Sequence, residues 1–223
     1  MSLDSAIWPA EQRDRIRRRL DRGLAQLGQD LDDRQRERLV AYLAGLARWN
    51  RAYNLTAVDD PMEMVDRHII DSLSVRPFLR GRRILDAGTG AGLPGVVLAI
   101  ADPGRHFILA DGNNKKIRFL RHIRRSLGLD NIEPVRARVE SLELDPPPDE
   151  IVARALAPLV RLVEWLGPWL DSGARLLAMK GKLEESERTA LPGAYNVELV
   201  QLEWPGQRGA RCLAIVSRGE QEP

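Results

Sequence analysis

The sequence is poor in cysteine, in lysine and in long apolar runs. Its one cysteine, Cys212, excludes an intramolecular disulfide framework and is typical of a protein in a reducing compartment. No stretch approaches the roughly 20 consecutive apolar residues that a membrane-spanning helix requires. The first residues lack the basic and apolar segments of a secretory signal. We therefore expect a cytoplasmic protein with no membrane span.

Basic charge comes almost entirely from arginine, because only four of the 34 basic residues are lysines. Arginine binds phosphate through two parallel hydrogen bonds, but a GC-rich genome would also enrich arginine without any functional meaning. The net charge of +2 is small, so the positions of the basic residues are more informative than their number. The hydrophobic fraction of 43% is that of a globular protein with a substantial core.

Helical patterns fill the first third of the chain. Amphipathic spacing predicts helices over 10–28 and 33–49, followed by a loop over 50–56. Asp60 and Pro61 are typical of a helix start, and Pro77 predicts the end of that helix. The organisation expected from these patterns is a helical region over 1–78, a sheet domain over 79–218 and a short tail over 219–223.

Strand and helix patterns alternate after residue 82. Alternation predicts an α/β fold with a mostly parallel sheet and helices on both faces, and the short polar connection between the last two strands predicts an antiparallel C-terminal hairpin. The result is a Rossmann-like sheet of seven strands. Strands are expected over 83–87, 106–111, 132–136, 150–154, 174–179, 195–203 and 211–217, and helices over 94–101, 114–127, 158–170 and 184–190.

A glycine turn follows the first predicted strand, and the sheet is organised around it. Glycine allows close backbone approach and positive φ, so this turn predicts a nucleotide site at a helix N-terminus, with Pro94 in the first helical turn. The spacing fits both the G-x-G-x-x-G of dinucleotide enzymes and the acid-x-G-x-G-x-G of S-adenosylmethionine enzymes. In either case Asp111, at the end of the second strand, is placed to bind a ribose. The residues concerned are Asp86, Gly88, Gly90, Gly92 and Gly95.

Three features favour a methyltransferase over a dehydrogenase. Asp86, at the end of the first predicted strand and the mouth of the site, suits a ligand that carries an amine, whereas its charge would repel a pyrophosphate. The expected C-terminal hairpin takes the place of a sixth parallel strand, which is the topology of methyltransferases. The chain also has no room for the second domain in which a dehydrogenase would bind a hydride acceptor. Ligands of open sheets lie over the carboxyl ends of the strands, which selects Gly88, Asp111, Val139 with Glu140, Arg154 and Lys180. Val139 would contact adenine, and Glu140 would accept from its amino group.

Several strings resemble the family of ribosomal RNA small subunit methyltransferase G, also called glucose-inhibited division protein B. WNRAYNLT at 49–56 resembles its WNKAYNLT, RHIIDSL at 67–73 its RHILDS, and DAGTGAGLPG at 86–95 its DVGTGPGLPG. The resemblance covers about residues 33–217. Two departures are Gly112, where the family usually has serine, and Ala91, where it commonly has proline.

The resemblance implies methyl transfer from S-adenosylmethionine to N7 of a specific guanine in 16S ribosomal RNA. The substrate would be the RNA itself, the small ribosomal subunit or an assembly intermediate, and no metal is expected. The donor would be bound by Gly88, Leu93, Val139, Glu140 and Arg154, with Asp111 at the ribose.

Guanine N7 carries a lone pair and no proton, so its methylation needs no general base. Catalysis should then come from positioning and electrostatics. The candidates near the base are Arg154, His68 and Asn54. RNA would be held by basic residues around the pocket. These are Lys115, Lys116, Arg118, Arg121, Arg124, Arg125, Lys180 and Lys182.

Other functions remain compatible with the residues. A methyltransferase of a small molecule or a protein would have the same donor site, an apolar substrate pocket and no basic rim, and a methyltransferase of another RNA base is a further alternative. A non-catalytic RNA-binding module would keep the fold without needing an intact glycine turn.

Overall fold

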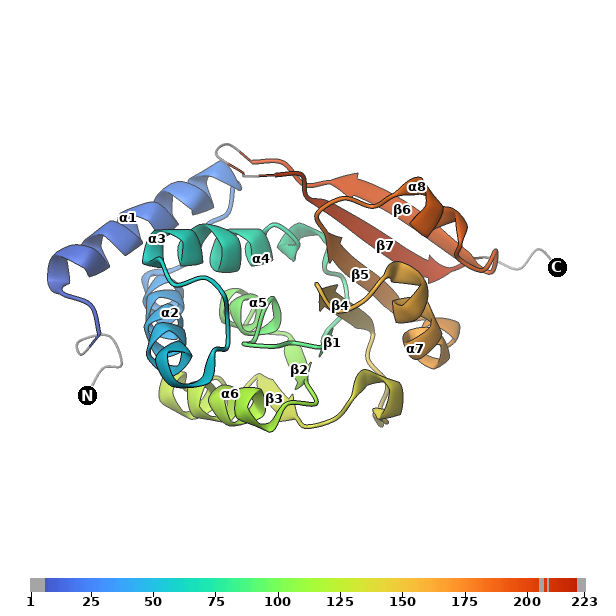
Figure 1. Cartoon of the computed structure of the whole chain (residues 1–223), viewed down its shortest axis with the longest axis horizontal. Coiled ribbons are helices and arrows are strands. Elements are labelled where there is room, and N and C mark those ends of the chain that lie inside the picture. Colours follow the sequence, from blue (N-terminus) through green and yellow to red (C-terminus); the bar gives the residue numbers. More distant parts are fainter. Residues whose placement is uncertain (1–6, 205–206, 208, 220–223) are drawn as a thin grey trace.

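The computed structural model describes residues 7–204, 207 and 209–219. Figure 1 shows one sheet of strands flanked by helices. Its seven strands lie in the order β3-β2-β1-β4-β5-β7-β6. The strands are β1 (Arg83–Ala87), β2 (His106–Ala110), β3 (Ile132–Val135), β4 (Glu150–Arg154), β5 (Arg175–Lys180), β6 (Tyr195–Gln201) and β7 (Cys212–Arg218).

The predicted sheet is confirmed. Every neighbouring pair from β3 to β5 is parallel, whereas β7 runs antiparallel to both β5 and β6. The connection between β6 and β7 falls partly outside the described residues. Because β7 is reversed, its first residue, Cys212, pairs with the last residue of β5, Lys180. The beginning of β7 therefore lies at the edge of the sheet where the parallel strands end.

The two faces of the sheet have separate cores. Side chains alternate along each strand. Ile84 therefore packs with the helices of one face and its neighbour Leu85 with those of the other. The first face is covered by the N-terminal helices, α5 (Gly95–Ala101) and α6 (Asn114–Leu127), and the second by η3 (Val139–Ser141) and α7 (Leu159–Asp171), which α8 (Glu185–Thr189) contacts.

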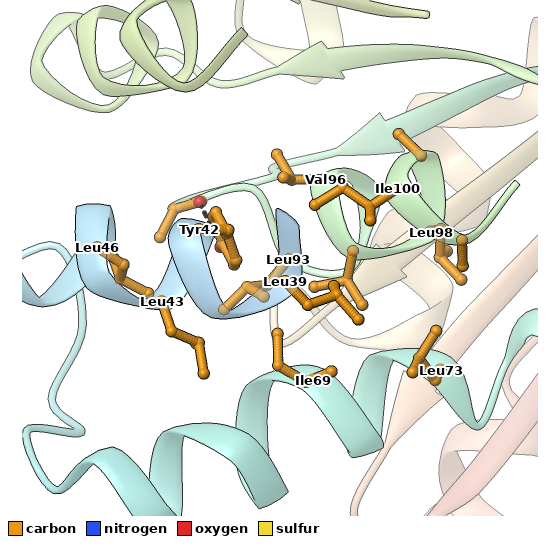
Figure 2. Packing of buried hydrophobic residues seen from close by; sticks show 14 of the residues in the cluster. Leu39, Tyr42, Leu43, Leu46, Ile69, Leu73, Leu93, Val96, Leu98 and Ile100 are labelled. Atoms are coloured by element: carbon orange, nitrogen blue, oxygen red, sulfur yellow. Dashed lines mark hydrogen bonds between the residues drawn. The ribbon is translucent and has the colours of Figure 1, made fainter. Parts of the chain in front are cut away.

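The N-terminal helices share one core with the sheet. Figure 2 shows side chains of α2 packed against the glycine turn and α5, with Ile69 and Leu73 alongside. The Tyr42 hydroxyl is buried and donates to the carbonyl of Ala91, at 2.8 Å, inside the glycine turn. The helical region thus supports the turn directly. Its elements are α1 (Ala10–Gln26), α2 (Asp33–Tyr53), α3 (Pro61–Met64), η1 (Val65–Ile70) and α4 (Asp71–Leu73).

The predicted loop over 50–56 is wrong in its first half, because α2 continues to Tyr53. Trp49 and Tyr53 are one turn apart, and their ring centroids lie 5.2 Å from each other, so the aromatic contact stabilises an extra turn. The helix ends at Asn54, whose φ of 50° is the left-handed conformation that asparagine tolerates.

Other helix ends differ from the sequence by a few residues. Asp60 accepts from the Glu63 amide, at 2.9 Å, as its position predicts. Regular helix stops at Leu73 rather than at Pro77, which lies in a separate 3₁₀ turn, η2 (Arg76–Phe78). Pro94 caps α5 instead of standing in its first turn. Among the described helices, none is long and apolar enough to cross a membrane.

Candidate functional site

Asp86 lies beneath the glycine turn and is fully buried. Its Oδ2 accepts from the Thr89 hydroxyl at 2.6 Å and from the Gly95 amide at 2.7 Å, while Oδ1 is buried without a partner among the described residues. Burial raises its pKa to about 6, against the hydrogen bonds that lower it. The expectation that Asp86 stands at the strand mouth is therefore wrong, because its side chain ties the turn to the start of α5.

Two glycines are required by this close packing. At Gly95 a β-carbon would overlap the Asp86 carboxylate and the Leu109 side chain. At Gly92 the backbone has φ of +97°, and a β-carbon would overlap Val96 and Leu120. The turn can hold this shape only with glycine at both positions.

A cavity of about 470 Å³ lies over the carboxyl ends of β1, β2 and β3. We call it the donor pocket. It brings together four residues that the sequence predicted as a donor site, Gly88, Asp111, Val139 and Glu140. The rest of its lining is Gly112, Asn113, Lys116, Ala137, Arg138, Leu156 and Trp165.

Hydrogen bonds hold the carboxylate of Asp111 at the wall of the donor pocket. Oδ2 accepts from the Gly90 amide at 3.0 Å and lies 3.2 Å from the Lys116 ammonium, and Oδ1 accepts from the Asn113 amide at 2.8 Å. A carboxylate accepts about four hydrogen bonds, so one position remains for a ligand. Asp111 is 8% exposed, and this geometry suits a ribose hydroxyl.

A second cavity, of about 270 Å³, lies over the ends of β4 and β5. We call it the target pocket. Two of the three residues predicted near the base, Arg154 and His68, line it, but Asn54 lines a different cavity. The complete lining is Val58, Arg67, His68, Asp71, Arg154, Ala155, Met179, Lys180, Gly181 and Arg211.

Asp71 joins two arginines in the target pocket. Its Oδ2 lies 3.0 Å from Arg154 Nη1, and its Oδ1 lies 2.8 Å from Arg211 Nε. Arg154 Nη1 also donates to the carbonyl of Arg67, at 2.9 Å. The carboxylate is only 6% exposed, so both guanidinium groups are held in fixed directions.

His68 is buried and neutral. Burial, together with the nearby charge of Arg154, lowers its pKa to about 4. Nε2 lies 3.0 Å from the Thr56 hydroxyl, while Nδ1 is buried with no partner among the described residues. The ring lies in η1, a π-helical turn that interrupts the helix between Pro61 and Leu73. Such turns are frequent at functional sites.

The turn after β4 separates the two pockets. Arg154 and Ala155 line the target pocket, and the next residue, Leu156, lines the donor pocket. Ala155 has φ of +51°, a conformation that costs energy for a residue with a β-carbon. The pockets thus share a wall at this turn.

Other predicted donor residues contribute to the turn rather than to the pocket lining. The Leu93 side chain lies in the core among α2 side chains, as Figure 2 shows. Gly92 is buried, and Gly90 reaches the pocket through its amide bond to Asp111. Donor contacts by Leu93, Gly90 and Gly92 remain predictions, as does the contact by Asp86.

The predicted RNA-binding residues fall into four groups. Five on α6 are exposed, whereas Lys116 is half-buried at Asp111. Lys180 is turned inward, with its Nζ 2.7 Å from Glu187 Oε1 and 3.0 Å from the carbonyl of Ala157. Lys182 is exposed and paired with Glu184. The five exposed residues are Lys115, Arg118, Arg121, Arg124 and Arg125.

Sequence reasoning missed Asp71, Arg211 and Thr56 as site residues. A signal for Arg211 was present, because the residue before a reversed strand lies at the same edge as the carboxyl ends of its parallel neighbours. Asp71 had no such signal, since only tertiary packing brings η1 and α4 to the ends of β4 and β5.

Comparisons with known proteins identify the family. The family model described as rRNA small subunit methyltransferase G matches residues 35–211. The chain belongs to this family. It is 51% identical over 201 residues to a ribosomal RNA small subunit methyltransferase G from Chromohalobacter salexigens, covering 90% of this chain and 96% of the relative. The corresponding protein of Salmonella arizonae is 46% identical over 199 residues, covering 89% and 96%.

The fold of this methyltransferase G family member also occurs in more distant structures. A SAM dependent methyltransferase from Aquifex aeolicus has a TM-score of 0.53 at 17% identity, over 73% of this chain and 96% of that one. Membership of the family identifies the chain as an rRNA methyltransferase, and the structural likeness shows that it has the fold of an S-adenosylmethionine-dependent methyltransferase. In the described part of the chain, no group of three or more histidine, cysteine or carboxylate side chains could hold a metal ion.

The donor pocket fits S-adenosylmethionine. Gly88, with φ of +67°, presents no β-carbon to the cavity. Asp111 offers an acceptor for the ribose, and the buried Val139 offers an apolar contact for a purine. These three positions come from three successive strand ends, as the open-sheet rule requires.

Proposed function

We propose that this enzyme methylates N7 of one guanine in 16S ribosomal RNA. The observation that carries the proposal is the shared wall between the donor pocket and the target pocket at Arg154, Ala155 and Leu156. A base in the target pocket lies next to whatever the donor pocket holds. We further propose that the enzyme acts in the cytoplasm on the RNA of the small subunit.

The charges around the target pocket support N7 as the acceptor atom. Bound S-adenosylmethionine supplies an electrophilic methyl group, and N7 methylation leaves the guanine ring positively charged. A bare cation against the ring would oppose this change. His68 is neutral at pH 7, and the charge of Arg154 is balanced by Asp71. The target pocket can therefore form hydrogen bonds, and neither Arg154 nor His68 places an unpaired positive charge in it.

No group in the pocket needs to take a proton from N7, because N7 carries none. The protein's part is to hold the guanine in line with the methyl group and to exclude water. Arg154 Nη1 is engaged by Asp71 and by the carbonyl of Arg67, which leaves the remaining N–H groups of this guanidinium to orient the guanine edge. Cys212 is buried and does not line the target pocket, in keeping with transfer that uses no covalent intermediate.

The proposal is tested by methyl transfer from labelled S-adenosylmethionine to undermethylated 16S RNA. Naked RNA, the small subunit and assembly intermediates are compared, and the product is digested to nucleosides. We expect label in 7-methylguanosine at a single position. Label at another base atom would remove the N7 assignment, and label only in small molecules would favour a small-molecule methyltransferase.

The non-catalytic alternative predicts a different result for the wild-type protein. Gly88→Arg fills the donor pocket, so methyl transfer should be lost while RNA binding is retained. An RNA-binding module with no catalytic role would show no transfer in the wild-type protein either.

A further inference from the structure

Aromatic rings and cations gather where α2 and α6 meet, outside both pockets. The Trp49 ring centroid lies 5.2 Å from that of Tyr53 and 5.4 Å from that of His122. Lys115 Nζ lies over the Tyr53 ring, 6.0 Å from its centroid. All three rings are partly exposed. We call Trp49, Tyr53 and His122 the aromatic platform.

The inner side of the platform is anchored in the core. Trp49 packs against the buried Phe119, with ring centroids 5.6 Å apart, and Phe119 in turn contacts Tyr42. The rings are therefore held by the fold before any ligand arrives. A preorganised ring loses little side-chain entropy when a ligand stacks on it.

The surroundings of the platform are positive. Burial lowers the pKa of His122, and the charges of Arg125 and Arg48 act in the same direction, which favours the neutral imidazole. Arg48, Lys115 and Arg125 are exposed. Neutral rings within a positive field match a strand that carries flat bases on a chain of phosphates.

Residues of the aromatic platform are close in sequence to residues that contact both pockets. Tyr53 lies three residues before Thr56, whose hydroxyl bonds His68 of the target pocket. Lys115 precedes Lys116, whose ammonium bonds Asp111 of the donor pocket. A strand that delivers a base into the target pocket can therefore reach the platform with a neighbouring nucleotide.

We propose that the aromatic platform stacks an unpaired base of the RNA strand next to the target nucleotide, while Arg48, Lys115 and Arg125 contact phosphates. The proposal rests on the proposed function, because it assumes an RNA acceptor. Stacking on aromatic rings is how proteins hold single-stranded RNA whose bases are splayed out.

The test measures the affinity of the full-length protein for a fluorescent single-stranded RNA that contains the target guanine and its neighbours, over a range of salt concentrations. Tyr53→Leu and His122→Leu should each weaken binding about fivefold or more. Tyr53→Phe keeps the ring and should bind within twofold of wild type. Because phosphate contacts remain in these variants, the slope of log affinity against log salt should not change.

Tyr195 offers a matched control. It is also a partly exposed tyrosine next to a cation, with Arg218 5.6 Å from its ring, but it lies on β6 at the far edge of the sheet. Tyr195→Leu should leave RNA affinity unchanged. Lys115→Gln should lower both the affinity and the salt slope, since it removes a phosphate contact.

The proposed role of the platform would be overturned if RNA affinity were unchanged in both Tyr53→Leu and His122→Leu. Equal loss of RNA affinity in Tyr53→Phe and Tyr53→Leu would overturn it as well. Circular dichroism melting of each variant separates weak binding from misfolding, and His122→Leu takes the place of Tyr53→Leu if the latter does not fold. The wild-type nucleoside product tests the proposed function separately. If 7-methylguanosine is made while the platform variants bind normally, only the platform fails.

Discussion

Asp71 and Arg154 are 83 residues apart in the sequence, yet their side chains meet at 3.0 Å between Oδ2 and Nη1. The contact joins the N-terminal helices to the end of β4. Since Arg211 reaches the other oxygen of the same carboxylate, one acid positions two cations that come from opposite edges of the target pocket. Asp71 is in this sense a positioning residue.

Asp71→Asn should therefore damage both the fold and the activity. The substitution removes the negative charge and turns one of the two accepting oxygens into an N–H donor, and we expect a loss of roughly 2–3 kcal/mol in the free energy of unfolding, below the range for fully buried pairs because both arginines are partly exposed. Misplacement of Arg154 should lower kcat by roughly 10- to 100-fold. Denaturant unfolding and single-turnover methylation measure the two effects.

Asp66→Asn is the control for that variant. Asp66 also holds an arginine, Arg19, at 2.7 Å, but its side chain is 37% exposed. An exposed pair contributes about 1 kcal/mol or less. A kcat loss in Asp66→Asn as large as that in Asp71→Asn would contradict the positioning role.

Asp111→Asn should weaken binding of S-adenosylhomocysteine about tenfold, because a ribose hydroxyl donates more strongly to a carboxylate than to an amide. Isothermal titration calorimetry measures the change without any RNA. Asp130→Asn, at an exposed acid beyond α6, should bind as wild type. Equal affinities of wild type and Asp111→Asn would refute the ribose contact.

Asp86 and His68 should give opposite pH dependences of stability. Asp86 has its pKa raised from 3.8 to about 6, so its contribution is present below pH 3.8 and is lost as pH rises through 6. His68 has its pKa lowered from 6.5 to about 4, so its contribution is present above pH 6.5 and is lost as pH falls through 4. Each amounts to about 3 kcal/mol, and in the wild type they largely cancel.

Variants separate the two groups. Relative to wild type, the free energy of unfolding of Asp86→Asn should rise with pH between 4 and 6.5, and that of His68→Gln should fall over the same interval. Urea unfolding at a series of pH values measures both. The assignment of the two pKa shifts would be contradicted if the free energies of unfolding of both variants, relative to wild type, changed with pH in the same direction.

Gly92→Ala should destabilise the protein by about 2 kcal/mol or more, because it combines a positive φ with overlap against Val96 and Leu120. Donor binding should fall as well, since the glycine turn changes shape. Gly104→Ala is the matched control. A β-carbon at Gly104 meets nothing within 4 Å, and we expect a change within about 0.5 kcal/mol in thermal unfolding.

The sheet and the donor pocket could be predicted because their signals are local in sequence. A strand pattern followed by glycines fixes where backbone comes close to a ligand, and the acid Asp111 follows the next strand end. Gly88, Asp111, Val139 and Glu140 were each named from position along the strands, and the structure places all four around one cavity.

The target pocket could be predicted only in part. Arg154 was found because it ends a strand, whereas Asp71 belongs to a helix whose distance from the sheet no periodicity reveals. Asp86 was misplaced for a related reason. A position at a strand end shows how far along the strand a residue lies. The alternation of side chains along the strand decides which face of the sheet the side chain is on. Asp86 is on the same face as Ile84 and points toward α5.

The reversed final strand has a consequence for biosynthesis. The donor pocket draws on residues up to Trp165, whereas the target pocket is completed only by Arg211, which directly precedes β7. A chain is made from its N-terminus, so a nascent or truncated polypeptide that stops before Arg211 carries every wall of the donor pocket and an incomplete place for the acceptor base. Asp71 then has only one of its two cations, and the acceptor site is complete only once Arg211 is part of the folded chain.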